Sequence, residues 1–407
     1  MRTLLILNFL IGGFCTTVLA QNPALTGQDT TSRPIVSAVP FLNVAADARA
    51  AALGDAAVAL DNGAFSTFWN PAQMAFAEQT ASVALSYTPW LRRLAKDMSL
   101  AYFTGYFKPD DVQAWGFSLN YFNQGEVILK DNNNNSMGSY HSFEAAVAVS
   151  YGRQLSKNWS IGGSLRLIHS NLVGNMTVGN VTAQPGTSMS GDVGVFYQTK
   201  EPARNRKGTS ITAAAVISNF GNKMNYGAGE RYFIPTKLNL GMAFKQHMQE
   251  HQINWLLSIQ KLMVPTPPLY ASDNGNVRRD SNGNPILLKG KDPNRNLFSG
   301  VFGSFADAPS GLQEELQEFM ISAGVEYWYN QLIAVRTGYF NEARSKGDRK
   351  MITSGVGLHF QNIGFDFAYL IPLRQNSPLA ETLRFSLAYN LGANDESRKL
   401  FNTRRRR

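Results

Sequence analysis

Cysteine is almost absent from this sequence: Cys15 is the only one in 407 residues. A chain with a single cysteine can form no internal disulfide framework and no cysteine-based zinc site. No run of about 20 apolar residues follows the N-terminal region, which excludes a protein that crosses a membrane with helices. Histidine is also scarce, with five residues in all, so few catalytic or metal sites could be built.

Motifs of common enzymes are missing as well. The sequence has no G-x-S-x-G nucleophile elbow and no glycine-rich phosphate loop followed by Lys-Ser or Lys-Thr. Residues 247–251, HMQEH, fit a zinc-protease pattern, but they lie at a predicted turn between strands rather than on a helix. Residues 280–284 begin like a calcium loop, but Pro285 and Lys291 stand where a glycine and a glutamate are required. We therefore predict no catalytic residue, no metal site and no cofactor.

The N-terminus has the form of a secretory signal peptide. Arg2 precedes an apolar stretch, and small residues lead up to Ala20. We predict that residues 1–20 are the signal peptide, with cleavage after Ala20. The formal charge of +9 is concentrated in loops and in the tail of residues 404–407. Export argues against nucleic acid as a partner, and leaves outer-membrane lipid or the phosphates of lipopolysaccharide for any bound anion.

Alternating apolar residues dominate the chain from about residue 80 to its end. In the last such segment, Leu383, Phe385 and Leu387 alternate with Arg384, Ser386 and Ala388. Successive side chains of a strand point to opposite faces, so one face of this strand is apolar. Fourteen such segments recur, with centres near Leu85, Tyr102, Leu119, Val147, Leu165, Val195, Ala214, Leu240, Leu257, Val325, Val335, Val356, Phe367 and Leu387. Charges on the other face, such as Lys237, Asp366 and Arg384, suit a wet or plugged lumen better than lipid.

The connections between these segments alternate in length. Long ones span residues 123–139, 171–187, 219–231 and 263–315, and short ones span residues 108–111, 153–157, 330 and 361–362. Outer-membrane barrels have short periplasmic turns and longer external loops. The sequence therefore predicts an all-β protein, a 14-stranded antiparallel transmembrane β-barrel over residues 79–392. We expect it in the outer membrane, with both termini in the periplasm and residues 393–407 as a basic periplasmic tail.

Residues 21–78 do not alternate. The stretch from Ala45 to Leu60 is rich in alanine, which favours helix, and Gly54 is expected to break that helix. Asn70 followed by Pro71 marks a turn. We predict that this region is a plug inside the barrel. Its residues Phe41, Gly54, Asn70 and Pro71 are expected to keep the lumen closed.

The loop of residues 263–315 is the longest connection, and long connections are often functional. Pro265, Thr266 and Pro267 stiffen its start. At its end, residues 311–319 form an expected helix with Leu312 and Leu316 on one face, beside Phe319, and acids on the other. Two interpretations remain open: the loop lies against the rim of its own barrel, or it forms a surface for a partner.

Several short strings resemble known families. The plug strings at residues 50–56 and 68–72 are similar to those of the broad group of FadL-like barrels. Strings that resemble the PorV family of the type IX secretion system lie at residues 32–42, 86–91, 262–268, 304–309, 325–330, 336–340 and 346–350. The resemblance covers nearly the whole chain after the signal peptide. The basic tail of residues 404–407 departs from it.

This resemblance implies a FadL-like barrel of fourteen strands without catalytic activity. It would receive the C-terminal signal domain of secreted cargo from a SprA-type translocon, whose lateral opening it could cap. It would then present the cargo to a sortase-like attachment complex containing PorU. For partner binding we predict residues of the first and the largest external loops: Trp90, Leu91, Pro265, Thr266, Pro267, Leu312 and Leu316.

Two other functions are weighed against this one. A FadL-like importer of hydrophobic small molecules would need an apolar luminal pocket, and Leu256, Phe103 and Trp328 are predicted to face inward and could line it. A lipid-modifying enzyme would need a histidine and an acid together near the rim, where His141 or His169 could serve.

Overall fold

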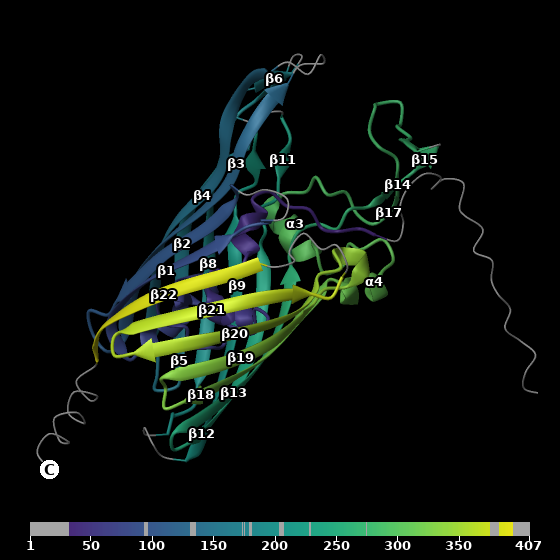
Figure 1. Ribbon diagram of the computed structural model, residues 1–407. Helices are drawn as coiled ribbons and strands as arrows, with labels where there is room; N and C mark the ends of the chain where they lie inside the picture. Colours follow the sequence, from purple (N-terminus) through teal and green to yellow (C-terminus); the bar gives the residue numbers. More distant parts are fainter. Residues whose placement is uncertain are drawn as a thin grey trace, which may run out of the picture.

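The computed structural model describes residues 32–92, 97–130, 136–172, 174, 176–178, 181–202, 207–227, 229–273, 275–374 and 382–393. Fourteen antiparallel strands close into one barrel, in which every strand pairs with its neighbours along the sequence and β1 pairs with β22 (Figure 1). The barrel strands are β1 (Gln79–Pro89), β2 (Ser99–Phe107), β3 (Gln113–Lys130), β4 (Ser136–Gln154), β5 (Trp159–Asn171), β8 (Gly186–Gln198), β9 (Gly208–Gly221), β12 (Lys237–Met248), β13 (His251–Leu262), β18 (Phe319–Tyr329), β19 (Ile333–Asn341), β20 (Lys350–Phe360), β21 (Ile363–Pro372) and β22 (Thr382–Ala393). Each predicted strand centre lies within an observed strand, so the predicted fold is confirmed.

The two faces of the wall follow the predicted alternation. On β22, Leu387 and Tyr389 are exposed on the outside, whereas Arg384 and Ser386 are buried inside. Lys237 and Asp366 are likewise buried on the inner face. The outer face is a nearly continuous apolar surface, as lipid requires.

The two ends of the barrel differ. One end, which we call the short-turn end, carries the connections 108–112, 155–158, 249–250, 330–332 and 361–362. The opposite end, the long-loop end, carries the connections of residues 90–98, 172–185, 222–236, 263–318 and 342–349. Small hairpins decorate its loops: β6–β7 (Met176–Val178, Val181–Ala183), β10–β11 (Met224–Asn225, Arg231–Tyr232), β14–β17 (Leu269–Tyr270, Leu287–Lys289) and β15–β16 (Ser272–Asp273, Asn276–Val277).

Short helices fill the lumen and cover part of the rim. In the lumen lie η1 (Pro40–Asn43), α1 (Ala48–Ala52), η2 (Gly63–Phe65), α2 (Ser66–Trp69) and η3 (Pro71–Phe76), and we call residues 40–76 the plug. At the long-loop end lie α3 (Leu297–Gly303), α4 (Leu312–Gln317) and η4 (Arg344–Lys346). No helix in the described ranges has the length and apolar character of a membrane span. Figure 1 shows the purple plug inside the wall and α3 and α4 beside it.

Glycines in the wall let the plug approach at backbone distance. A Cβ added to Gly338 of β19 would lie 2.2 Å from the backbone nitrogen of Gly54. Three other inner-face glycines also face backbone atoms of the plug: Gly152, Gly162 and Gly324. Four more face side chains of the plug: Gly116, Gly194, Gly241 and Gly355. The alanine-rich composition of the plug is the complementary half of this fit, because small side chains allow close packing. We call these wall glycines the glycine cradle.

Candidate functional site

The predicted plug residues all lie where the plug meets the wall. Phe41 is buried and stacks on Phe122 of β3, with 6.3 Å between the ring centroids. Gly54 has a φ of 66° and donates its backbone N–H to Thr353 Oγ1 at 3.1 Å, so a side chain there would be both strained and crowded. Asn70 caps η3 and donates to the carbonyl of Val195 at 3.1 Å. Pro71 follows it at the first position of η3.

A buried cluster of charges fastens the plug to the wall. Glu326 of β18 is fully buried and accepts a hydrogen bond from Arg49 Nε of α1 at 2.8 Å. The same carboxylate accepts from Arg336 Nε at 2.7 Å and from Asn254 Nδ2 at 2.7 Å. Arg336 also donates to Asp366 Oδ1 at 2.7 Å. The charges compensate one another inside the lumen, as buried ions must.

One small cavity of the described residues lies in the lumen. This cavity, lined by Leu42, Trp69, Lys237 and other residues, measures about 20 Å³, close to the volume of one water molecule. Of the residues predicted to line an importer pocket, Leu256 and Trp328 do face inward and are buried. Phe103 does not, and that prediction is wrong. Its neighbour Thr104 bonds to Thr67 of the plug at 2.6 Å, which places Phe103 on the outer face.

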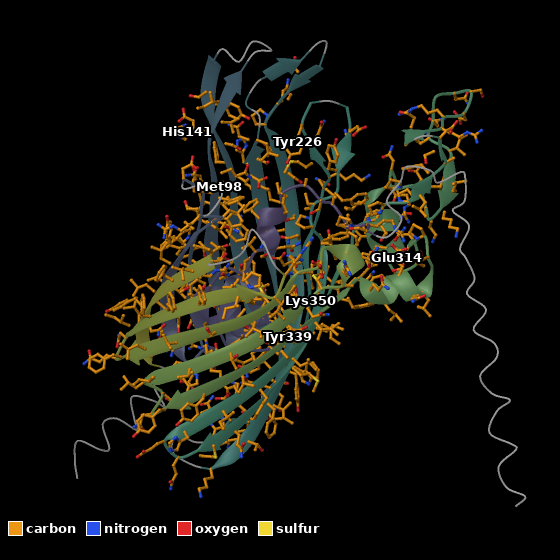
Figure 2. All side chains as sticks on the ribbon, turned by 45° about the vertical axis from the view of Figure 1, so that its right-hand side comes forward. Met98, His141, Tyr226, Glu314, Tyr339 and Lys350 are labelled. Carbon is orange, nitrogen blue, oxygen red and sulfur yellow. The ribbon has the colours of Figure 1, made fainter. Side chains whose placement is uncertain are left out.

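At the long-loop end, the acidic face of α4 packs against the barrel wall and the neighbouring loop. Glu314 accepts from Arg33 Nε at 2.9 Å and from Lys346 Nζ at 2.7 Å. Glu318, just after α4, accepts from Lys346 Nζ at 2.9 Å and also from Lys261. Lys261 further donates to Glu315 Oε2 at 3.1 Å. We call these six residues the α4 clamp; it ties the start of the described chain, β13 and the β19–β20 loop to one helix, and Figure 2 shows Glu314 beside the barrel rather than over its lumen.

The predicted loop residues fall into two groups. Pro265 and Thr266 are buried and Pro267 is half-buried beneath α4, where Thr266 Oγ1 donates to Glu318 Oε1 at 2.5 Å. Leu312 and Leu316 instead project from the exposed face of α4. The helix ends at Gln317 and Phe319 begins β18, so the expectation that Phe319 lies beside them on one helical face is wrong. Phe319 belongs to the strand because its backbone pairs with that of Lys261 in β13.

The connection between β1 and β2, at the long-loop end, carries Trp90 and Leu91. Trp90 is half-buried and meets the ring of Phe122 edge-on, with 6.1 Å between the centroids. Leu91 has a φ of 47°, the left-handed conformation of a tight turn. Phe122 also stacks on Phe41, so this loop rests on the upper part of the plug. The structure does not bring these two residues into contact with α4.

The α4 clamp should respond to acid. Burial by itself would raise the pKa of Glu314, but the hydrogen bonds from Arg33 and Lys346 outweigh it and lower the pKa to about 2. Because its pKa is lowered in the folded protein, Glu314 stabilises the clamp at pH values above about 4.5, the ordinary pKa of a glutamate. This contribution is lost as the pH falls from about 4.5 to about 2. We expect amide hydrogen exchange in residues 310–318, corrected for intrinsic rate, to lose protection across this window.

The variant Glu314→Gln measures how much this carboxylate contributes to the stability of the α4 clamp. Its residues 310–318 should exchange faster than those of the wild type at pH 6, with a weaker dependence on pH. Glu230→Gln makes the same change in another loop of the long-loop end, where the carboxylate accepts from the hydroxyl of Tyr232 at 2.8 Å, and should leave α4 unchanged. Constant protection of wild-type α4 down to pH 2 would contradict the assignment.

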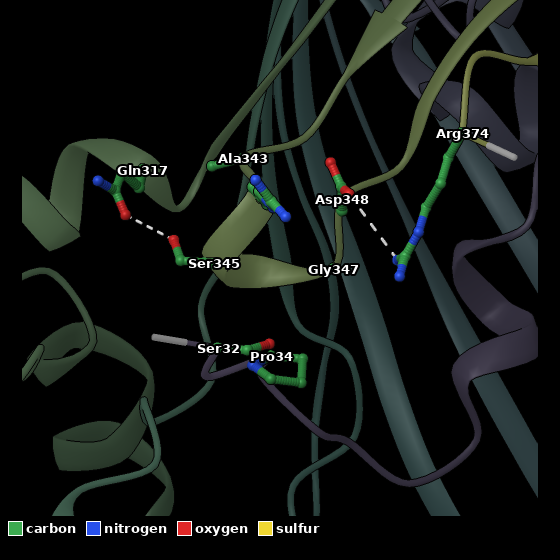
Figure 3. Close-up of a pocket in the computed structure, with 9 residues that line it drawn as sticks. Ser32, Pro34, Gln317, Ala343, Ser345, Gly347, Asp348 and Arg374 are labelled. Carbon is green, nitrogen blue, oxygen red and sulfur yellow. Dashed lines mark hydrogen bonds and ion pairs between the residues drawn. The ribbon is translucent and has the colours of Figure 1, made fainter. Parts of the chain in front are cut away.

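A cleft opens next to the α4 clamp. Its volume is about 1040 Å³, and it lies between the start of the described chain, the end of α4, the β19–β20 loop and the end of β21 (Figure 3). Its lining includes Ser32, Pro34, Gln317, Ala343, Arg344, Ser345, Gly347, Asp348 and Arg374. Gln317 accepts from Ser345 at 2.5 Å, and Arg374 lies 3.8 Å from Asp348. Arg344 and Arg374 are exposed, so the cleft presents two cations to solvent.

The histidine motif forms no metal site. His247 is the penultimate residue of β12 and His251 begins β13, so the predicted turn between strands is confirmed. His247 lies 3.4 Å from Ser210 Oγ, whereas His251 Nδ1 lies 2.8 Å from the hydroxyl of Tyr327. Throughout the described ranges, no group of three or more His, Cys, Asp or Glu residues is arranged to hold a metal ion. Residues 280–284 form a tight turn in which Asp280 accepts from the backbone of Asn282 and Asn284, at 2.9 Å each.

The sequence profile of the family described as "Type IX secretion system protein PorV" matches residues 27–269. The match extends from before the plug, through the strands β1 to β13, into the large loop. The chain belongs to the PorV family. It is therefore an outer-membrane component of the type IX secretion system, and its family and fold are those of secretion and transport rather than of enzymes. No curated protein matches the sequence.

Solved structures that this PorV-family barrel resembles include a FadL homologue and a toluene transporter. A Pseudomonas aeruginosa FadL homologue is 12% identical, with 88% of this chain and 100% of that chain covered and a TM-score of 0.45. The Pseudomonas putida toluene transporter TodX is 13% identical, with 91% and 96% covered and a TM-score of 0.38. Similarity at this level carries no functional weight. The assignment of the fold rests instead on the strand order of this PorV-family barrel.

Sequence reasoning placed Asp366 on the inner face and acids on one face of the expected helix, but it did not find the other charged residues of the Glu326 cluster and the α4 clamp. Glu326 and Arg336 stand at inner-face positions of apolar strands, and a charge at such a position is a usable signal for a buried pair. Arg33, Lys261 and Lys346 of the α4 clamp gave no such signal. They lie far from α4 in the sequence; Arg33 and Glu314 are 281 positions apart.

Proposed function

We propose that this PorV-family barrel binds the C-terminal signal domain of secreted cargo at its long-loop end. It carries the cargo from a SprA-type translocon to a PorU-type, sortase-like attachment complex. Family membership supports a role in secretion, and the cleft beside the α4 clamp is the observation that carries the binding site. Because the plug fills the lumen, the cargo stays outside the barrel.

The orientation in the membrane is part of the proposal. Long loops of outer-membrane barrels face the cell surface, so the long-loop end would face outward. Residue 393, at the end of β22, pairs with Gln79 at the short-turn end and would lie on the periplasmic side. Arg33 contacts α4 at the opposite end, so in this orientation the described chain would begin at the cell surface. The expectation of a periplasmic N-terminus therefore does not extend to residue 32; residues 1–31 and the basic tail lie outside the described residues.

The cleft suits a polypeptide with acidic groups. Its exposed Arg344 and Arg374 can each bind a carboxylate through two parallel hydrogen bonds. Trp90 and Leu91 offer a second contact on the first external loop. The buried Pro265 and Thr266 and the half-buried Pro267 would act by holding α4 in place rather than by touching the cargo.

Charge reversal in the cleft tests this assignment. In cells whose only copy carries Arg344→Glu and Arg374→Glu, we expect about a tenfold fall in the cargo that co-purifies with the barrel in mild detergent. The exported proteins are identified by mass spectrometry, and those with a common C-terminal domain are quantified.

Arg278→Glu with Arg279→Glu is the matched control. It makes the same change of charge on an exposed hairpin of the large loop, outside the cleft, and cargo recovery should stay near the wild-type level. Equal recovery with both double variants would contradict the cleft as the cargo site. A barrel that purifies alone with bound fatty acid, together with normal secretion in a deletion strain, would favour the importer instead.

A further inference from the structure

The outer face of α3 and α4 is apolar and exposed. Its members are Phe298 at 65%, Phe302 at 55%, Phe305 at 41%, Leu312 at 76% and Leu316 at 63% exposure. We call these five residues the α3–α4 surface. Large apolar side chains gathered on one face mark a contact with something other than water.

No charge is exposed between Asn296 and Gln317. The charged residues in this range are Asp307, Glu314 and Glu315, and all three are buried, with exposures of 1%, 3% and 6%. The preceding part of the same loop is the reverse, because Arg278 and Lys291 there are exposed. One loop thus has a polar part that faces water and an apolar part that turns its acids inward.

The α3–α4 surface continues the lipid-facing wall. Phe298 and Phe302 pack on Phe220 at the end of β9, with 5.4 and 6.3 Å between ring centroids. Val301 of α3 is buried in a cluster that includes Leu238, which belongs to the same outward row of β12 as the exposed Leu240.

The other helix is attached to the same outer face. Lys261 belongs to the outward row of β13 that also contains Leu257 and Ile259, and α4 covers it with Glu315 and Glu318. One residue separates the end of α4 from β18, where Ile321 is exposed on the outside. Both helices therefore lie on the outer wall at the edge of the membrane band.

We propose that the α3–α4 surface is an interfacial anchor that inserts among the lipids of the outer leaflet. Its continuity with the lipid-facing rows, its phenylalanine and leucine side chains and its lack of exposed charge fit the boundary between headgroups and acyl chains. The α4 clamp gives this anchor its form, because it turns the acids toward the wall and leaves Leu312 and Leu316 outward. The leaflet assignment rests on the orientation given above, whereas contact with lipid does not.

The experiment uses single cysteines in the full chain with Cys15→Ser. Phe302→Cys and Leu316→Cys are each labelled with an environment-sensitive fluorophore, and the purified protein is reconstituted into phosphatidylcholine vesicles. Some of the lipid carries a nitroxide quencher high on its acyl chain. Leu257→Cys on the lipid face of β13 is the positive control, and Ser281→Cys on the polar hairpin of the same loop is the negative one.

We expect about twofold quenching by the nitroxide lipid at Phe302→Cys and Leu316→Cys, close to the value at Leu257→Cys and well above that at Ser281→Cys. Aqueous iodide should show the opposite order. The anchor is overturned if both sites behave like Ser281→Cys. It is also overturned if they are shielded from iodide only in native membranes that contain the other secretion proteins, which would assign the surface to a protein partner.

Discussion

Replacing Glu326 by glutamine is expected to destabilise the folded barrel by about 3–5 kcal/mol. The carboxylate is fully buried and receives hydrogen bonds from Arg49 Nε and Nη2 at 2.8 Å each and from Arg336 Nε at 2.7 Å. A glutamine of the same shape removes the negative charge and turns an NH₂ group toward these donors. Arg336 keeps Asp366 as a partner. The variant therefore mainly weakens the pairing of Arg49, which attaches α1 to the wall.

The measurement is the urea midpoint of unfolding in detergent, followed by the change in gel mobility between folded and unfolded barrel. Asp348→Asn is the matched control, because Asp348 lies 3.8 Å from Arg374 and the two side chains are 21% and 64% exposed. A pair of this kind contributes about 1 kcal/mol or less. Equal shifts for the two variants would show that the buried cluster does not secure the plug.

Substituting alanine for Gly338 is expected to destabilise the barrel by about 3 kcal/mol and to loosen the plug. The new Cβ would lie 2.2 Å from the backbone nitrogen of Gly54 and 2.2 Å from the carbonyl carbon of Leu53. Both neighbours are backbone atoms, which cannot turn aside as the end of a side chain can. Either the plug or the wall must shift.

Unfolding in urea measures the loss of stability, and ion conductance across a planar bilayer reports a plug that no longer seals the lumen. Gly364→Ala serves as the control on the inner face outside the glycine cradle. Its Cβ would come within 3.1 Å of His359 Nε2, the end of a side chain that can move, and we expect a change of about 1 kcal/mol or less. Wild-type stability together with wild-type conductance in Gly338→Ala would mean that the plug does not rest on the cradle.

The barrel could be predicted from sequence because one physical rule acts on every strand. A wall between lipid and a filled lumen forces apolar residues outward at every second position, and this placed all strand centres correctly. The rule is weakest where both faces are apolar. On β2, Tyr102 and Phe103 are both aromatic, and only the bond of Thr104 to the plug shows that Phe103 faces outward.

The long-loop end could be predicted only in part. Periodicity correctly placed Leu312 and Leu316 on one face of α4 and the acids on the other. It could not show which face is buried, because a soluble helix normally hides its leucines. Here the acids are buried instead, because Lys261 and Lys346 are buried partners for Glu315 and Glu318. The two lysines come from a strand and a loop that are distant from α4 in the sequence. The cleft could not be predicted from the sequence either, because four separate segments of the chain form it.

The closure of the wall has a consequence for how the molecule is assembled. β1 pairs with β22, with Leu85 opposite Leu387, so the seam joins the first barrel strand to the last. The plug precedes both in the chain and touches several strands at backbone distance. We expect the plug to be in position while the strands still form an open sheet, with the seam between β1 and β22 closing around it.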